Sequence, residues 1–466
     1  MNPPKCHPGT RVAILNRFSD WVKDSHSPTH ISWLFGPAGA GKSAIARSLA
    51  ELLTANGLLA GSFFFYRTDA RRNSVKALVP TLSYQISCSI FESQLLITRA
   101  LAYDPMVFYR SFRTQFEALI LNPVTHIPSA TSLTSSSSPI RPMLIIIDGL
   151  DECEDQNERR LVLRTIYDAM PHLCGQLKFL IASRPEFDIQ TFFELPYIKA
   201  NVNIVELLED ARAYDDVRIY LQESFHQLKQ THPLRATFES DWPPTDAVER
   251  LVAKSSGHFI YASTVIKYID SPYDRPTRRL EQILGLCQPS HNPYGDLDVL
   301  YYNILSSVSF NARRSVFIDV LSTALVCGFV DLSTFYFTFD DVGLARSDRF
   351  VESLLSLEPG EVRLAFVDLK SLVVFEKKNK SATSSLSDVS MIQFSHKSFS
   401  DFLCDPSRAK DFYVNREHGY TTLAKLCLAV ISDYDNLMER SMVQYSKPHH
   451  INFIIFIGIG KELDGT

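Results

Sequence analysis

The segment from His30 to Ala55 constrains the fold of this chain more than any other part of it. An apolar, β-prone run, Ile31–Phe35, leads into the glycine-rich stretch Gly36–Ser43, and apolar residues then recur at helical spacing. The expected order is therefore strand, loop and helix. Such a loop turns backbone N–H groups toward an anion at the helix N-terminus, because glycines tolerate the positive φ angles that it needs.

The loop reads Gly-Pro-Ala-Gly-Ala-Gly-Lys-Ser, which is the spacing of a phosphate-binding loop. We expect Lys42 to reach the β- and γ-phosphates of a nucleotide and Ser43 to bind Mg²⁺ through its hydroxyl. The alternative is a glycine-rich turn before an ordinary helix, and the correct flanking elements disfavour it. The predicted nucleotide-binding residues of the loop are Gly36, Pro37, Ala38, Gly39, Ala40, Gly41, Lys42, Ser43 and Ala44.

Length and charge narrow the class of protein. At roughly 150 residues per domain, 466 residues predict about three domains, and 45% apolar with 21% charged residues is an ordinary globular composition. The net charge of −5 gives no whole-chain basic field, so we expect no nucleic-acid partner. The apolar runs are far shorter than the roughly 20 residues of a spanning helix, and the N-terminus does not look like a signal peptide. We therefore expect a cytoplasmic protein with no membrane partner.

The eight cysteines are scattered, with no C-x-x-C pair and no neighbouring histidine cluster. This spacing argues against a zinc site and against a disulfide framework. Buried thiols in a reducing compartment are the simpler interpretation.

Short apolar runs alternate with helical windows between residues 30 and 208, which predicts a parallel sheet covered on both faces. The predicted strands are Ile31–Phe35, Gly61–Tyr66, Met143–Ile147, Leu177–Ala182 and Val202–Glu206. The predicted helices are Thr10–Val22 with Thr10 as N-cap, Ser74–Ile90, which Pro80 either kinks or opens, Tyr109–Leu121 and Glu158–Met170. The fold class is α/β, with a P-loop NTPase core followed by a helical domain and a winged-helix-like domain.

We divide the chain into five parts. A lead-in helix in residues 1–29 precedes the NTPase core, 30–208, in which the Ser/Thr/Pro-rich stretch 123–142 forms a disordered insertion, either a plain linker or a phosphorylated loop. Amphipathic windows predict a helical domain in 209–330. Short apolar segments with helices near them predict a winged-helix-like domain in 331–415, before a final helix and apolar tail in 416–466.

Acidic residues follow the strand Met143–Ile147 and supply the other half of the expected site. A carboxylate at a strand end, across from a phosphate loop, holds the Mg²⁺ that bridges phosphate oxygens, and we assign Asp148 to this role. A second acid must orient or deprotonate the attacking water; Asp151 and Glu152 are candidates, and Glu152 is favoured. The alternative is an acidic turn that caps the helix starting near Asp155.

Arg184 follows the strand Leu177–Ala182 and is the third predicted catalytic residue. A cation at this place can sense the γ-phosphate and stabilise the charge that develops during transfer. The alternative is a surface ion pair with Glu186 or Asp188. We favour sensing, because the strand end faces the same cleft in this architecture.

Three segments together resemble the NACHT domain of the STAND class of signal-transducing P-loop ATPases, which includes the NOD-like receptors. They are GPAGAGKSAIA at 36–46, LIIIDGLDEC at 144–153 and FLIASRPE at 179–186. Other segments are similar to NACHT proteins abundant in mushroom-forming fungi, namely CHPGTR at 6–11, SFFFYR at 62–67, DVRIYL at 216–221, SSGHFIYAS at 255–263 and FSHKSFSDFL at 394–403. The resemblance covers about residues 6–405.

The resemblance implies a molecular switch with Mg²⁺ and ATP or ADP as cofactors and weak ATPase activity. ADP would hold a closed form, and exchange for ATP would open the chain for nucleotide-driven oligomerisation. It also implies that Gly257 lies near the adenine, although Phe259 stands where many relatives carry proline. His396 matches a histidine that contacts the β-phosphate in NOD-like receptors; the alternative is a histidine that makes one structural hydrogen bond.

Relatives usually carry an effector domain before CHPGTR and sensor repeats after the winged helix, and this chain has essentially neither. We therefore expect a stand-alone switch or an incomplete gene product, whose partners are a nucleotide and either a second copy or a protein that supplies the missing function. Two rival functions are a small-molecule phosphotransferase, which would need an acceptor pocket, and a non-catalytic scaffold with a structural nucleotide.

Overall fold

The computed structural model describes residues 4–67, 69, 71–127, 142–173, 175–207, 212–272, 274–285, 295–306, 314–327, 347–366, 369–377, 390–417, 419–421 and 423–425. The chain forms two compact units, residues 1–300 and 301–466. Most of the predicted insertion at 123–142 and most of the predicted C-terminal helix and tail lie outside the described residues. The boundaries of the five predicted parts stay a prediction.

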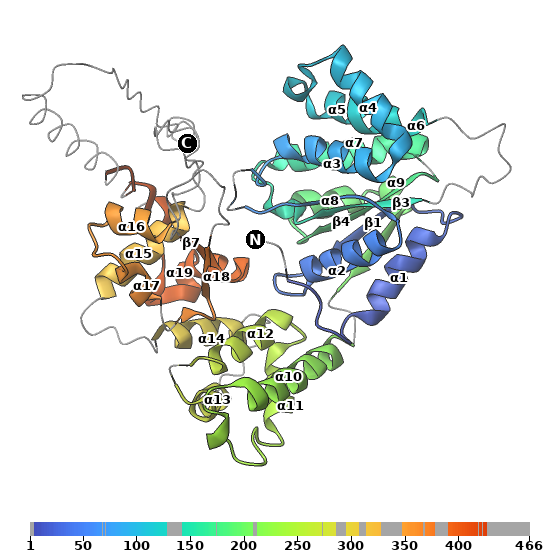
Figure 1. The fold of residues 1–466 in the computed structure, drawn as a ribbon. Helices are drawn as coiled ribbons and strands as arrows, with labels where there is room; N and C mark the ends of the chain where they lie inside the picture. The colour runs from blue at the N-terminus through green and yellow to red at the C-terminus, as the bar shows by residue number, and fades with distance from the viewer. Residues whose placement is uncertain are drawn as a thin grey trace, which may run out of the picture. The chain divides into compact units, whose positions relative to one another are not determined.

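Five parallel strands form the sheet of the first unit, in the order β2-β3-β4-β1-β5 (Figure 1). The strands are β1 Ile31–Phe35, β2 Leu59–Phe64, β3 Met143–Asp148, β4 Leu177–Ser183 and β5 Val202–Glu206. The predicted strands and the α/β fold class are confirmed. Only β2 is displaced, because Leu59 already pairs with Leu144 and the strand ends at Phe64.

Helices cover both faces of this sheet, as Figure 1 shows for α1 and α2 on one face and α3, α4, α5 and α7 on the other. Alternation along β3 explains the two layers: Leu144 and Ile146 are buried with α1 and α2, whereas Ile145 and Ile147 are buried with the opposite layer. The helices of this region are α1 Val12–Lys23, α2 Lys42–Ala55, α3 Leu78–Ser89, α4 Phe91–Tyr103, α5 Phe112–Phe116, α6 Asn122–Thr125, α7 Gln156–Leu173, α8 Phe187–Glu194 and α9 Pro196–Lys199.

The start of α1 differs from the prediction. Arg11, not Thr10, holds the N-cap position, with a left-handed φ of 57° and no side-chain cap. The Thr10 hydroxyl donates instead to the carbonyl oxygen of His7 at 2.7 Å, so it closes the preceding turn. The Arg11 side chain is buried.

The window Ser74–Ile90 begins with a 3₁₀ turn, η1 Val75–Ala77, before α3. Pro80 therefore lies in the first turn of α3, where its missing N–H is not needed, so it opens the helix and does not kink it.

The window Tyr109–Leu121 is also divided, into the 3₁₀ turn η2 Val107–Tyr109, α5 and the π-helical turn η3 Glu117–Leu121. The predicted start of the insertion at Pro123 is wrong, because Pro123 and Val124 are buried in α6.

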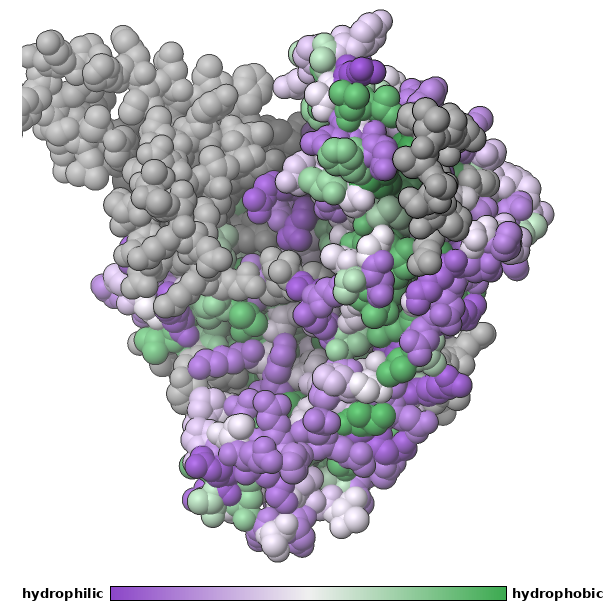
Figure 2. All heavy atoms as spheres, turned by 45° about the vertical axis from the view of Figure 1, so that its right-hand side comes forward, coloured by the Kyte–Doolittle hydropathy of each residue, from purple (hydrophilic) through white to green (hydrophobic). Residues whose placement is uncertain are grey.

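The helix α4 was not predicted from the sequence, because several of its apolar side chains are exposed. Only Ser93 and Ile97 are buried in this helix, whereas Phe91 is 78% and Tyr103 is 93% exposed. Apolar residues reach the surface in the upper part of Figure 2, over the α3–α5 segment. Among the described residues, no helix combines the length and the apolar character that crossing a membrane requires.

The predicted helical windows after the sheet are confirmed. They form α10 Arg212–Thr231, α11 Ala247–Ser255, α12 Phe259–Ile269, α13 Pro276–Gly285 and α14 Gly295–Ser306. In the second unit, β6 Val373–Lys377 and β7 Ser390–Phe394 form an antiparallel hairpin. Helices near it are α15 Arg314–Cys327, α16 Asp348–Leu354, α17 Glu361–Ala365, α18 Lys397–Leu403 and α19 Pro406–Ala409.

Candidate nucleotide-binding site

The loop Gly36–Ser43 joins β1 to α2, as predicted. Gly39 and Gly41 have φ angles of 78° and 94°, in the left-handed region that only glycine adopts without strain. The ammonium of Lys42 folds back over the loop, and its Nζ donates to the carbonyl oxygens of Gly36 at 2.7 Å and Pro37 at 2.8 Å. The cation is therefore held inside the turn that the glycines form.

Asp148 is the last residue of β3 and is 3% exposed. Burial raises the pKa of its carboxyl to about 7; the hydrogen bond from Ser43 lowers that pKa, and the charge of Glu152 raises it. Its Oδ1 has no hydrogen-bond partner among the described residues. A hydroxyl beside a buried carboxylate with an unused oxygen is an oxygen donor set of the kind that Mg²⁺ takes, so Ser43 and Asp148 fit the predicted metal.

Gly149 lets the chain turn back sharply after Asp148. Its φ is 72°, its N–H donates to the carbonyl oxygen of Ala182 at 2.8 Å, and a Cβ there would lie 3.2 Å from the carbonyl oxygen of Phe65. The 3₁₀ turn η4, Leu150–Glu152, follows directly. We call residues 148–153 the acidic turn.

Asp151 and Arg184 are brought together at the carboxyl ends of β3 and β4. The Asp151 Oδ1 accepts from the Arg184 backbone N–H at 3.0 Å, and its Oδ2 lies 3.5 Å from the Arg184 Nε. The Asp151 side chain is 3% exposed. The suggested alternative pair with Asp188 is wrong, because Asp188 pairs with Arg159 instead.

Glu152 is half-buried, and Arg67 lies against it from the end of β2. The Glu152 Oε2 accepts from the Arg67 backbone N–H at 3.0 Å, and the Arg67 Nη2 donates to the carbonyl oxygen of Asp151 at 3.0 Å. No role was predicted for Arg67. Its position just after β2, which lies next to β3 in the parallel sheet, is the sequence feature that could have identified it.

The N-terminal end of α12 packs on the phosphate loop within the first unit. The Ile260 N–H lies 3.4 Å from the carbonyl oxygen of Gly39, and a Cβ on Gly39 would lie 2.1 Å from the Ile260 Cγ2. His258, just before α12, is buried, and burial together with the charge of Lys42 lowers the pKa of its imidazole. The helical segment therefore contacts the loop at Gly39, and His258 lies close enough to Lys42 to feel its charge.

Arg11 ties the same elements together from the start of α1. Its Nη2 donates to the carbonyl oxygen of Ala40 at 3.1 Å, and its Nε lies 3.7 Å from the Asp216 Oδ2 on α10. Its guanidinium also lies 5.2 Å from the ring centroid of Phe259. Gly257 has a φ of 77°, which a turn into α12 requires.

His396 lies in the second unit and caps α18. Its Nδ1 accepts from the Ser398 backbone N–H at 3.0 Å, and the Ser398 hydroxyl lies 2.7 Å from the same nitrogen. The Tyr301 hydroxyl is 2.8 Å from that of Ser398. The structural hydrogen bond named as the alternative is therefore present, and a phosphate contact stays a prediction.

The strand order, the phosphate loop and the acidic turn at the carboxyl ends of the strands define an α/β domain of the P-loop NTPase class. Residues 9–184 also match the family model described as Nephrocystin 3, N-terminal. No curated protein matches the sequence.

Several solved structures are distantly similar. Cdc6p from Pyrobaculum aerophilum is 12% identical, with a TM-score of 0.37 over 91% of this chain and 95% of its own. The Aeropyrum pernix ORC1 protein in complex with DNA is 12% identical, with a TM-score of 0.34 over 89% and 92% of the two chains. Drosophila ORC bound to DNA is 10% identical, with a TM-score of 0.33 over 91% and 88%.

These structures correct the prediction about partners. Two of the three similar proteins are bound to DNA, so the expectation that excluded nucleic acid is wrong as it was argued. It rested on net charge alone, and net charge averages over the surface, whereas binding depends on local charge. The partners of this chain are not established by its sequence.

Proposed function

We propose that the chain is a NACHT-type switch that binds Mg·ATP or ADP, hydrolyses ATP slowly, and acts in signal transduction through nucleotide-driven oligomerisation. The observation that carries the proposal is the packing of α12 on the phosphate loop, with Ile260 over Gly39. A nucleotide bound in the loop and the helix α12 would contact the same loop residues. Nucleotide binding can therefore alter the position of α12.

The loop residues would surround the phosphates with backbone N–H groups, and Lys42 would exchange its carbonyl partners for phosphate oxygens. Ser43 and Asp148 would hold Mg²⁺, which when bound supplies neutralisation of phosphate charge. Glu152 would orient the attacking water, because it is half-buried and within reach of solvent, whereas the Asp151 side chain is 3% exposed and is held by Arg184. Arg184 would sense the γ-phosphate from its place beside Asp151.

Switching requires that the two nucleotides bind the two forms with different affinity. The Arg11 contacts would stabilise one of these two forms, because they link the loop at Ala40 to α10 through Asp216 and to α12 through Phe259. We assign this form to ADP. A γ-phosphate would add charge between Arg184 and Lys42 and favour a form with α12 released.

The proposal is tested by hydrogen exchange at the α12 amides and by the mass of the chain in solution. Each is compared in ADP and in Mg²⁺ with a non-hydrolysable ATP analogue. Faster exchange in α12 and a larger mass with the ATP analogue support the switch. Identical exchange and mass in both nucleotides would overturn it.

A cytosolic location completes the proposal. The described cysteines Cys6, Cys88, Cys153 and Cys404 are free thiols, in keeping with a reducing compartment. Localisation of the tagged chain in cells tests this expectation.

A further inference from the structure

A buried ion pair lies directly behind the acidic turn and has no role in the chemistry proposed above. Arg159, in the first turn of α7, is 5% exposed, and Asp188, in the first turn of α8, is 4% exposed. The Arg159 Nε donates to the Asp188 Oδ2 at 2.8 Å. Two charges this deep are costly to desolvate, and replacing such a pair by apolar residues is often stabilising, so stability alone explains it poorly.

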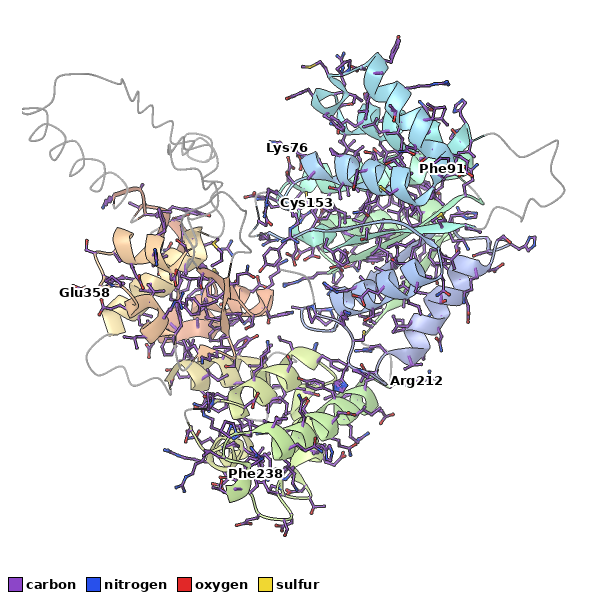
Figure 3. All side chains as sticks on the ribbon, viewed as in Figure 1. Lys76, Phe91, Cys153, Arg212, Phe238 and Glu358 are labelled. Carbon is purple, nitrogen blue, oxygen red and sulfur yellow. The ribbon has the colours of Figure 1, made fainter. Side chains whose placement is uncertain are left out.

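The Nη1 of the Arg159 guanidinium, which is not the nitrogen bound to Asp188, binds the backbone of the acidic turn. Its Nη1 donates to the carbonyl oxygen of Asp151 at 3.2 Å and lies 3.4 Å from that of Cys153. These two carbonyl groups flank Glu152. Figure 3 labels Cys153 at the end of the sheet where the turn lies.

The side chain of Asp151 holds Arg184 through its carboxylate. A continuous path of contacts therefore runs from Asp188 through Arg159 and the Asp151 peptide to Arg184. The two ends come from α8 and from the end of β4, which are joined by the short segment containing Pro185. The rigid fork of arginine can hold a carboxylate and a carbonyl group at once, whereas lysine has one nitrogen.

We propose that Arg159, held by Asp188, is a positioning residue for hydrolysis: it fixes the backbone on both sides of Glu152 and thereby the direction of Glu152 and of the Asp151–Arg184 pair. The inference rests on the proposed function. Arg159 makes none of its contacts with the phosphate loop, so it acts on turnover and not on nucleotide binding.

The test uses the full chain with Arg159→Lys and Asp188→Asn, and Arg160→Lys as the matched control, because Arg160 is the exposed neighbour on the same helix. We expect kcat for ATP to fall by about 10- to 100-fold in the first two variants, the range typical of lost supporting contacts. KM and the ADP affinity from calorimetry should stay within about threefold, since the loop is untouched. The control should match the wild type in all three.

The thermal midpoint of each variant separates positioning from folding. A variant that melts earlier but keeps the wild-type kcat at a temperature where it is folded would overturn the positioning role. A rise in KM and a fall in kcat together with lost ADP binding would do so too, because it would mean a general collapse of the site. Asp188→Asn keeps the shape of the side chain and remains informative if Arg159→Lys does not fold.

The two proposals fail in different ways. If the wild type binds nucleotide but does not hydrolyse it, the hydrolysis proposal fails. The positioning role, which concerns turnover alone, then fails with it. If the wild type binds no nucleotide, both proposals are wrong. If it hydrolyses ATP and the variants do so equally well, only the positioning role is wrong.

Discussion

The phosphate loop and the acidic turn lie at the same edge of the sheet, but they are built in opposite ways. The loop Gly36–Ser43 is local: its glycine φ angles and the fold-back of Lys42 onto Gly36 and Pro37 involve residues at most six positions apart. The acidic turn is assembled from a distance. Arg67 reaches the Asp151 carbonyl oxygen from 84 positions before it, and Arg184 reaches the Asp151 carboxylate from 33 positions after it.

This difference separates what each part can contribute. A backbone loop presents N–H donors to any nucleotide phosphate, so we expect it to set binding. Side chains held from several elements can be aimed, which proton transfer to and from a water requires. Mutations in the loop should therefore change affinity, and mutations in the turn should change turnover.

The largest effect is expected from Glu152→Gln. General acid–base catalysis contributes about 100- to 10,000-fold, and glutamine keeps the shape of the side chain but cannot take a proton. We expect kcat for ATP to fall by at least about 100-fold, with ADP affinity unchanged. Single-turnover measurement of phosphate release, beside calorimetry with ADP, checks both.

Unchanged turnover in Glu152→Gln would support the scaffold alternative. The comparison sharpens with Asp151→Asn, which we expect to reduce the hold on Arg184 and so to weaken the preference for ATP over ADP. If the two variants had the same kcat for ATP and the same preference for ATP over ADP, Asp151 and Glu152 would not have separate roles.

The contrast also explains how much could be predicted from the sequence. The strand Ile31–Phe35, the loop that follows it and the place of Asp148 at the end of β3 were predicted correctly, because each depends on residues next to it in the chain. The sequence could not show that Arg184 pairs with Asp151, or that Arg159 takes Asp188, because these pairs depend on how α7, α8 and β4 pack. Composition failed for the partners, since net charge carries no spatial information.

Local misassignments have the same origin. The helix α4 escaped notice because Phe91 and Tyr103 are exposed, so its apolar residues do not follow the burial that periodicity assumes. Thr10 looked like an N-cap by residue type, but Arg11 is held at that position by Asp216 and Ala40, far along the chain.

The second effect in size is expected from Lys42→Ala. Hydrogen bonds to charged groups contribute about 1.5–3 kcal/mol, so affinity for ADP and ATP should fall by roughly 10- to 100-fold. Lys76→Ala is the matched control, because Lys76 is exposed in η1, just before α3, and away from the loop in Figure 3. Calorimetry that finds equal ADP affinity for Lys42→Ala and wild type would show that the site assignment is wrong.

A third prediction concerns Asp148, whose pKa burial raises to about 7. Between about pH 4 and pH 7 the unfolded chain has lost this proton while the folded chain keeps it, so the free energy of unfolding falls as pH rises through this window. Asp148→Asn removes the effect. Without nucleotide, the variant should be more stable than wild type at pH 8, by an amount on the order of 2–4 kcal/mol, and the gap should close near pH 4.

Urea unfolding at pH 4, 6 and 8 measures this gap, and a constant difference across the three would contradict the buried ionisation. The effect of Mg²⁺ on ADP affinity gives a second measurement of the same ionisation. Mg²⁺ needs the ionised carboxylate, so the gain in ADP affinity on adding Mg²⁺ should shrink below about pH 7 in the wild type. In Asp148→Asn that gain should be small at every pH.

The smallest effect compares two glycines of the same loop, Gly39→Ala and Gly41→Ala. Both have left-handed φ angles, so both alanines should cost about 1–2 kcal/mol in strain. At Gly41 a Cβ meets nothing within 4 Å among the described residues, whereas at Gly39 it would lie 2.1 Å from the Ile260 Cγ2. Only Gly39→Ala should therefore displace α12, seen as faster hydrogen exchange of the α12 amides without nucleotide. Equal exchange in the two variants would mean that α12 does not rest on the loop in solution, and the loop would then bind nucleotide without acting on the helix.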